Sequence, residues 1–183
     1  MMRYGFIGLG HLGRFLAGSL VKGGFDLTVH DLDKANAEGL IKAGAKWADD
    51  PQAVAAAVDC VITCLPSPKV SEAVLTGPRG ILSGLKSGGT WIEMSTLDHN
   101  DVVRLAAVAA EKGVRMMESP VTGGVHKAAS GEITVIAGGD KDLFELHKPA
   151  LAAMGGEIFH AGELGKAAVI KVITNMLAFI HLI

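Results

Sequence analysis

The amino-acid sequence predicts an α/β fold built on a doubly wound parallel sheet. Strand-like and helix-like segments alternate along most of the 183 residues, the pattern expected where helices cover both faces of a parallel sheet. The first strand, over 2–7, runs into a glycine-rich turn and a helix over 11–22. No repeat or low-complexity tract interrupts the alternation.

The remaining elements follow in order and are separated by residues that favour turns. Gly44 and Gly113 end two of the helices, and Pro51 begins another, where its missing N–H costs little. We expect strands over 27–30, 60–65, 90–93, 114–117, 133–137 and 157–160. We expect helices over 34–43, 51–58, 69–75 and 142–154, one that ends at 112 after a cap at Asp98 or Asn100, and a last helix from 165 onward.

The turn Gly8-Leu9-Gly10-His11-Leu12-Gly13 has the spacing of a dinucleotide-binding loop. There Gly8 permits the tight turn, Gly10 lets the backbone approach a pyrophosphate, and Gly13 lets the helix pack on the strand. The helix start offers free N–H groups and the positive end of its dipole to phosphates. Asp31 follows about 20 residues further on, where a ribose-binding carboxylate belongs. The alternative is a glycine-rich turn in an unrelated α/β domain.

The composition argues against several other classes of protein. Hydrophobic residues make up 49% of the chain, enough for a sizeable core, and a net charge of −2 gives no electrostatic case for a nucleic-acid partner. Cys60 and Cys64 lie on the same face of one predicted strand, too far apart to form a disulfide. Their spacing is not that of metal ligands. We therefore expect a reduced, cytoplasmic protein without a metal site. Lys171 and Asn175 interrupt the apolar segment 167–183, which argues against a membrane span.

The same two residues, Lys171 and Asn175, are four positions apart and so share one face of the last helix. Polar groups on an otherwise apolar helix are costly unless they are satisfied or used. Burial lowers the pKa of a lysine into the range useful for proton transfer. The alternative is a lysine that reaches solvent along its aliphatic stem, beside a surface asparagine.

Two loops near predicted strand ends carry groups suited to a small ligand. Thr122-Gly123-Gly124 offers a hydroxyl and two unobstructed N–H groups, a small cradle for a carboxylate. Ser95-Thr96 follows the strand 90–93 at its carboxyl end, where ligands bind in open α/β sheets. Ordinary turns are the alternative for both loops.

Four separated motifs, in order along the whole chain, resemble the β-hydroxyacid dehydrogenase family. This group includes 3-hydroxyisobutyrate dehydrogenase, tartronate semialdehyde reductase and 6-phosphogluconate dehydrogenase. The motifs are the glycine loop, Cys64-Leu65-Pro66, the segment 118–124, and Gly162-Glu163-Leu164-Gly165 with Lys171 and Asn175. The family more often has serine at the position of Thr122 and aspartate at that of Glu118, which leaves the substrate open.

The resemblance implies a Rossmann-type fold and hydride transfer between NAD(P) and a small, 3-hydroxyisobutyrate-like β-hydroxyacid. It makes Lys171 the general acid or base, oriented by Asn175, and assigns the substrate carboxylate to Thr122, Gly123 and Gly124. It assigns cofactor contacts to Leu65, Pro66 and Thr96, beside the six loop residues 8–13 and Asp31. The alternatives are a glyoxylate or semialdehyde reductase of the same family, and a non-catalytic nucleotide-binding module.

Asp31 also predicts NAD as the cofactor, because its charge repels the 2′-phosphate of NADP. Lys34 lies close enough in sequence to soften this discrimination, so NADP is possible.

We expect a cofactor-binding domain over 1–162 and the first part of an interdomain helix over 163–183, followed by an all-helical domain absent from this chain. The resemblance further implies a homo-oligomer, at least a dimer. For the apolar last helix, the alternative to a missing domain is a natural C-terminal helix that is buried in a dimer.

Overall fold

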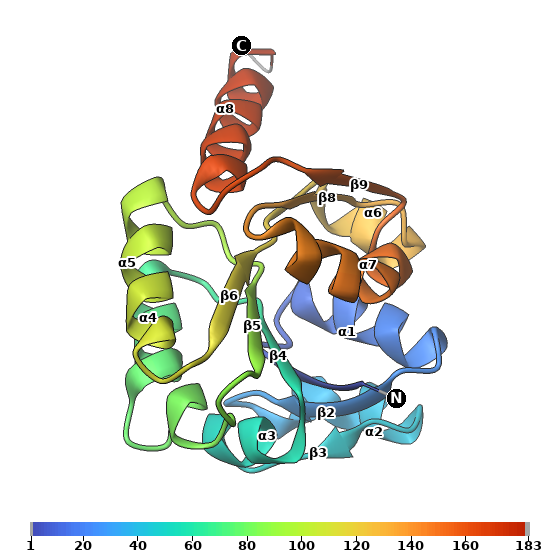
Figure 1. Cartoon of the computed structure of the whole chain (residues 1–183). Coiled ribbons are helices and arrows are strands. Elements are labelled where there is room, and N and C mark those ends of the chain that lie inside the picture. The colour runs from blue at the N-terminus through green and yellow to red at the C-terminus, as the bar shows by residue number, and fades with distance from the viewer. Residues whose placement is uncertain (1, 182–183) are drawn as a thin grey trace.

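A six-stranded parallel sheet forms the centre of this computed structural model, which describes residues 2–181 (Figure 1). Its strands lie in the order β3-β2-β1-β4-β5-β6, so the chain changes direction across the sheet between β1 and β4. This order confirms the predicted doubly wound Rossmann-type fold. The strands are β1 (Arg3–Ile7), β2 (Asp26–His30), β3 (Lys46–Trp47), β4 (Cys60–Thr63), β5 (Thr90–Glu93) and β6 (Arg115–Glu118).

Helices cover both faces of this sheet, and each face has its own apolar core. Leu16 of α1 (Gly13–Lys22) and Leu151 of α7 (Lys141–Met154) are buried on one face. Leu75 of α4 (Pro68–Thr76) and Leu105 of α5 (His99–Ala110) are buried on the other. The remaining helical segments are α2 (Glu38–Lys42), α3 (Pro51–Ala57), α6 (Gly124–Ser130), α8 (Lys166–His181) and two short 3₁₀ turns, η1 (Lys34–Ala37) and η2 (Ile81–Ser83).

The last strands leave the main sheet and form a second, three-stranded one in the order β7-β8-β9. The strand β8 (Thr134–Ala137) pairs antiparallel with β7 (Val121–Thr122) and parallel with β9 (Glu157–His160). A backbone bridge between Glu118 and Gly138 joins the two sheets. The predicted strands 133–137 and 157–160 are present, but the strands β3 and β7, of two residues each, were not predicted.

Three of the predicted elements had boundaries that were wrong by a few residues. The first helix begins at Gly13 rather than at residue 11, because residues 10–12 form the turn that leads into it. The predicted helix 34–43 starts as the 3₁₀ turn η1, with the Asp33 carboxylate accepting the Ala35 N–H, and becomes α-helical at Glu38. The loop residues after β4 leave the sheet at Cys64, so that strand is shorter than predicted.

The helix α8 extends away from the rest of the fold (Figure 1). Of its described residues, only Ala167 and Ala168 are buried. Among residues 2–181, no helix combines the length and the apolar character needed to cross a membrane. Residues 182 and 183 of the predicted segment 163–183 lie outside the described residues. The exposed large apolar side chains of α8 are Val169, Ile170, Val172, Ile173, Met176, Leu177, Phe179 and Ile180.

Burial of His147 in the core makes the stability of the fold depend on pH. His147 Nδ1 lies 3.1 Å from the hydroxyl of Tyr4, and both side chains are buried. Burial lowers the pKa of His147 from 6.5 to about 4. A histidine with a lowered pKa in the folded state binds protons more readily when unfolded, so protonation favours unfolding.

We therefore expect the free energy of unfolding to fall as the pH falls from 6.5 towards about 4. His147→Gln removes the titrating group and should flatten this part of the pH profile. Urea unfolding at a series of pH values measures the effect, with the exposed His126→Gln as the control. An unchanged slope in the His147 variant would assign the pH dependence to other groups.

Candidate functional site

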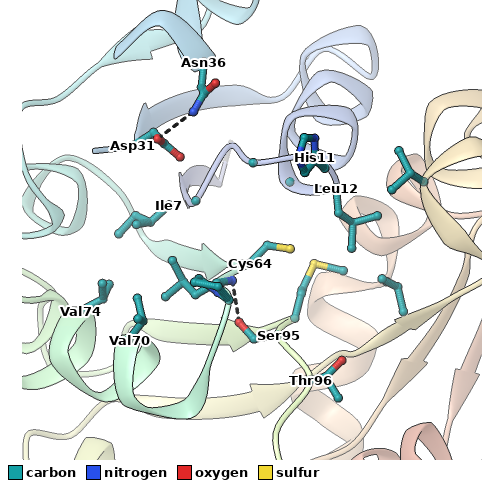
Figure 2. Close-up of a pocket in the computed structure, with 18 of the residues that line it drawn as sticks. Ile7, His11, Leu12, Asp31, Asn36, Cys64, Val70, Val74, Ser95 and Thr96 are labelled. Atoms are coloured by element: carbon teal, nitrogen blue, oxygen red, sulfur yellow. Dashed lines mark hydrogen bonds between the residues drawn. The ribbon is translucent and has the colours of Figure 1, made fainter. Parts of the chain in front are cut away.

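A cavity of about 730 Å³ opens at the carboxyl ends of the parallel strands, where the strand order changes direction (Figure 2). Ligands bind at this position in open α/β sheets. The loops after β1, β2, β4 and β5 line it, together with one residue of α8. The predicted site residues that line it are Gly8, Gly10, His11, Leu12, Gly13, Asp31, Leu65, Pro66, Thr96, Gly124 and Lys171.

The three glycines of the first loop have the distinct surroundings that their predicted tasks require. A Cβ on Gly8, whose φ is +95°, would collide with the Cys64 carbonyl oxygen, and a Cβ on Gly13 would collide with the Gly8 carbonyl oxygen. A Cβ on Gly10 would instead meet no heavy atom within 4 Å. Gly8 and Gly13 therefore bring strand and helix together, whereas Gly10 faces open space that can receive a ligand.

The N-terminus of the helix α1 lies at this cavity and has no side-chain cap. Leu12 occupies the N-cap position and makes no side-chain hydrogen bond to the helix, and the first turn holds no acidic residue. The positive end of the helix dipole thus favours a negatively charged ligand. Together with the open space at Gly10, this arrangement fits the pyrophosphate of a dinucleotide.

Asp31 follows β2 and is held by several hydrogen bonds, one of them to the side chain of Asn36 (Figure 2). Its carboxylate accepts hydrogen bonds from the N–H of Leu9 at 2.6 Å, the N–H of Asp33 at 2.9 Å and the side-chain amide of Asn36 at 3.0 Å. Burial alone would raise the pKa of Asp31, but these hydrogen bonds lower it below its ordinary value. The group is therefore an anion that lines the cavity.

Two neighbours of Asp31 differ from the sequence prediction in their contacts. The side chain of Leu9 is buried in the core rather than in the cavity wall, so Leu9 contributes through its N–H to Asp31. Lys34 Nζ lies over the ring of Trp47, 5.3 Å from its centroid, a cation–π contact. Asn36, which the sequence analysis did not single out, lines the cavity beside Asp31.

A chain of hydrogen bonds fixes the loops after β4 and β5 relative to each other. The Leu65 N–H donates to Ser95 Oγ at 2.7 Å, and the Ser95 N–H donates to Glu93 Oε1 at 2.7 Å. Glu93 is fully buried, and burial raises its pKa. The hydrogen bond from Ser95 to Glu93 was not predicted, although a carboxylate at the end of a largely apolar strand is a signal that the sequence offers.

The predicted substrate loop lies at the edge of the cavity, with its residues in different environments. Gly124, with φ of +83°, lines the cavity. Thr122 pairs with Thr134 in the small sheet, and Gly123, with φ of +124°, precedes α6. Neither of these two is among the residues that line the cavity.

Lys171, on the helix α8, lines the same cavity as the glycine loop. Its side chain is half-buried, and burial lowers its pKa. Asn175 lies one turn further along α8, half-buried but not among the residues that line the cavity. Within the part of the chain that the structure describes, no three His, Cys, Asp or Glu side chains lie close enough to hold a metal ion.

Comparison with known proteins identifies the family that carries this arrangement. Residues 3–162 match the sequence model described as the NAD binding domain of 6-phosphogluconate dehydrogenase. The chain belongs to the β-hydroxyacid dehydrogenase family. The predicted family resemblance and the predicted nicotinamide dinucleotide cofactor are thereby confirmed. The uncapped N-terminus of α1, Gly10 and Asp31 are the features of this structure that fit that cofactor.

Similar members of the β-hydroxyacid dehydrogenase family include two bacterial enzymes. The chain is 36% identical over 176 residues to 2-(hydroxymethyl)glutarate dehydrogenase of Eubacterium barkeri, with 96% of this chain and 58% of that protein covered. It is 37% identical over 183 residues to NAD-dependent L-serine dehydrogenase of Pseudomonas aeruginosa, with 100% and 61% covered. The chain thus spans about three-fifths of the length of these curated relatives.

The fold of the family is also seen in a solved structure. Mycobacterium tuberculosis 3-hydroxyisobutyrate dehydrogenase with L-serine superposes with a TM-score of 0.91 at 29% sequence identity. The match covers 97% of this chain and 60% of that one. The matches to these three proteins each cover at least 96% of this chain, so each of them reaches into the helix α8, which begins at residue 166.

The glycine loop provides a test that separates binding from folding. Gly10→Ala places a methyl group in the open space before α1, so we expect NAD to bind at least about tenfold more weakly. We expect the free energy of unfolding of this variant to change by only about 0.5 kcal/mol. Gly13→Ala forces the helix off the Gly8 carbonyl and should lower stability by about 1–3 kcal/mol.

Calorimetric NAD titration and urea unfolding of both variants measure the two effects separately. A Gly10→Ala protein that binds NAD as the wild type does would show that the pyrophosphate lies elsewhere. A Gly13→Ala protein of wild-type stability would show that the helix does not approach the strand as closely as the structure has it.

Proposed function

We propose that this chain is the cofactor-binding part of an NAD-dependent dehydrogenase that oxidises a small β-hydroxyacid of the 3-hydroxyisobutyrate type. The observation that carries the proposal is the position of Lys171. It lines the same cavity as the glycine loop, and burial lowers its pKa. An amine in that state exchanges protons near neutral pH more readily than a solvated lysine does.

In the proposed reaction each residue has a role that its surroundings support. The N-terminus of α1 and Gly10 bind the pyrophosphate, and Asp31 accepts hydrogen bonds from the ribose hydroxyls. When bound, the nicotinamide dinucleotide supplies the capacity to accept or donate a hydride. Lys171 removes the proton from the substrate hydroxyl during oxidation and returns it during reduction. Asn175 orients Lys171 or the substrate hydroxyl.

The substrate carboxylate is proposed to bind at the loop of Thr122, Gly123 and Gly124, whose hydroxyl and N–H groups suit an anion. The substrate names of the similar enzymes support this class of molecule. The compounds 2-(hydroxymethyl)glutarate, L-serine and 3-hydroxyisobutyrate all carry a hydroxyl group β to a carboxylate. Run in reverse, the same residues reduce a semialdehyde.

We also propose that the exposed apolar face of α8 is covered in the whole enzyme by an all-helical domain. The length ratio to the relatives and the eight exposed apolar side chains of α8 support this division into a domain over 1–162 and an interdomain segment over 163–183, in which the helix α8 begins at Lys166. A homo-oligomer and a cytoplasmic location remain predictions from the sequence.

Substitution of Lys171 tests the proposed reaction directly. In the whole enzyme, Lys171→Ala should lower kcat on its best β-hydroxyacid by about 10²–10⁴, the usual contribution of a general acid or base. NAD affinity should stay within about twofold, because the dinucleotide is held by other elements. The exposed Lys166→Ala, on the same helix, is the matched control.

The assay uses a panel of 3-hydroxyisobutyrate, 3-hydroxypropionate, L-serine and glycerate, followed by NADH absorbance. Near-normal turnover by Lys171→Ala would refute its role in proton transfer. Tight NAD binding without turnover of any β-hydroxyacid or semialdehyde would favour a non-catalytic nucleotide-binding module.

Asp31 provides a second test, of cofactor preference. Its anionic carboxylate should make the protein bind NAD at least about tenfold more tightly than NADP. Asp31→Asn should reduce this ratio, since it removes the charge and keeps an oxygen that accepts from Leu9. Dissociation constants for both dinucleotides at one ionic strength measure the ratio, with the exposed Asp33→Asn as control. A wild-type preference for NADP would contradict the assignment.

A further inference from the structure

Two of the helices that contribute to the cavity wall, α1 and α8, differ at their N-termini. The N-terminus of α1 has no side-chain cap and is open to a ligand. The N-terminus of α8 is filled by a carboxylate of the protein itself, that of Glu118. The N-terminus of α1 is thus available to a ligand, whereas the N-terminus of α8 is held in position by Glu118.

Glu118 is the last residue of β6, and its side chain is buried. Its Oε1 accepts the N–H of Ala167 at 3.1 Å, and its Oε2 accepts the N–H of Ala168 at 2.9 Å. Both oxygens are thus used on the first turn of α8, where a negative charge also meets the positive end of the helix dipole. Burial raises the pKa of Glu118, and these N–H donors oppose that effect.

The backbone around this carboxylate is shaped to hold it. The N–H and the carbonyl of Glu118 both pair with Gly138, at 3.0 Å and 2.9 Å, so the same residue joins the main sheet to the small one. A Cβ on Gly138 would collide with Glu118 Oε1. Gly165, with φ of +88°, leaves room for the ring of His99.

The position of Lys171 depends on this first turn. Ala167 and Ala168, the buried described residues of α8, are the two that donate to Glu118. Lys171 follows Ala167 by four residues, about one turn and 6 Å along the axis. A shift or rotation at the first turn is therefore transmitted to the lysine, because both lie on one continuous helix whose later described residues are not buried.

Glu118 also begins the segment that leads to the proposed carboxylate-binding loop. Ser119, the next residue, donates its N–H to the Glu93 carbonyl oxygen at 2.6 Å, which keeps the chain on the sheet. Thr122 follows within four residues. One side chain thus ties the helix that carries the proton-transfer group to the strand that carries the substrate loop.

We propose that Glu118 is a positioning residue, which sets the place of Lys171 in the cavity by holding the first turn of α8. This inference rests on the proposed role of Lys171 in proton transfer. Glu118 itself does not line the cavity, so it acts through the helix and touches neither substrate nor cofactor.

The test replaces one accepting oxygen with a donor. Glu118→Gln turns an NH₂ group toward a helix N–H and should loosen the first turn. In the whole enzyme we expect kcat to fall about 10- to 100-fold, the effect of a misplacement of about 1 Å, with the NAD dissociation constant within about twofold. Glu163→Gln makes the same change at an exposed position three residues before α8 and should leave kcat unchanged.

Two further measurements do not depend on turnover. Hydrogen exchange at the amides of Ala167 and Ala168 should become at least about tenfold faster in Glu118→Gln. The pH profile of Lys171 modification by an amine reagent, followed by mass spectrometry, should shift toward that of a solvated lysine. Glu118→Asp keeps the charge but shortens the reach, and should show the same changes to a smaller extent. It also provides the measurement if the glutamine variant does not fold.

The outcomes separate this inference from the proposed function. Normal turnover by Lys171→Ala would refute the function and, with it, the reason for positioning the lysine. Loss of activity in Lys171→Ala, with unchanged kcat and Lys171 reactivity in the Glu118 variants, would overturn only the role of Glu118. Lower kcat in those variants with unchanged Lys171 reactivity and amide exchange would likewise overturn it.

Discussion

The close approach of α1 to the end of β1 is the constraint on which the cavity depends. No side chain separates them, because a Cβ on Gly13 would collide with the Gly8 carbonyl oxygen. Gly8 in turn packs against the Cys64 carbonyl of the next strand's loop. The helix N-terminus is therefore fixed above the carboxyl edge of the sheet, at the point where the strand order changes direction. The other loops surround this fixed point.

Carboxylates at strand ends organise those loops by a common principle. Asp31 follows β2 and accepts from Leu9, Glu93 ends β5 and accepts from Ser95, and Glu118 ends β6 and accepts from the start of α8. In each case the acid lies at or directly after the end of a strand, and a loop or the first turn of a helix donates a backbone N–H. A carboxyl oxygen held by a strand gives each backbone N–H a fixed acceptor, so each of these hydrogen bonds defines the path of its segment.

The sequence predicted the part of this arrangement that depends on local spacing. The glycine loop, Asp31 and the alternation of strands and helices are all readable over short distances. The separate sheet β7-β8-β9 was not predicted, because an apolar strand pattern does not specify which neighbour the strand pairs with. The contact of Glu118 with Ala167 spans 49 residues and has no local signature. The open loop 122–124 was predicted as a unit, yet only Gly124 faces the cavity.

The hydrogen bond between Asp31 and the Leu9 N–H couples the two ends of the dinucleotide site. A protein engineer who exchanges this aspartate for a small apolar or a basic residue, to admit a phosphorylated ribose, also removes the acceptor that fixes the amide beside Gly10. The expected side effect is a less ordered loop and weaker binding of every dinucleotide, whatever its ribose. A successful redesign must therefore introduce a replacement acceptor for Leu9 together with the new phosphate contact.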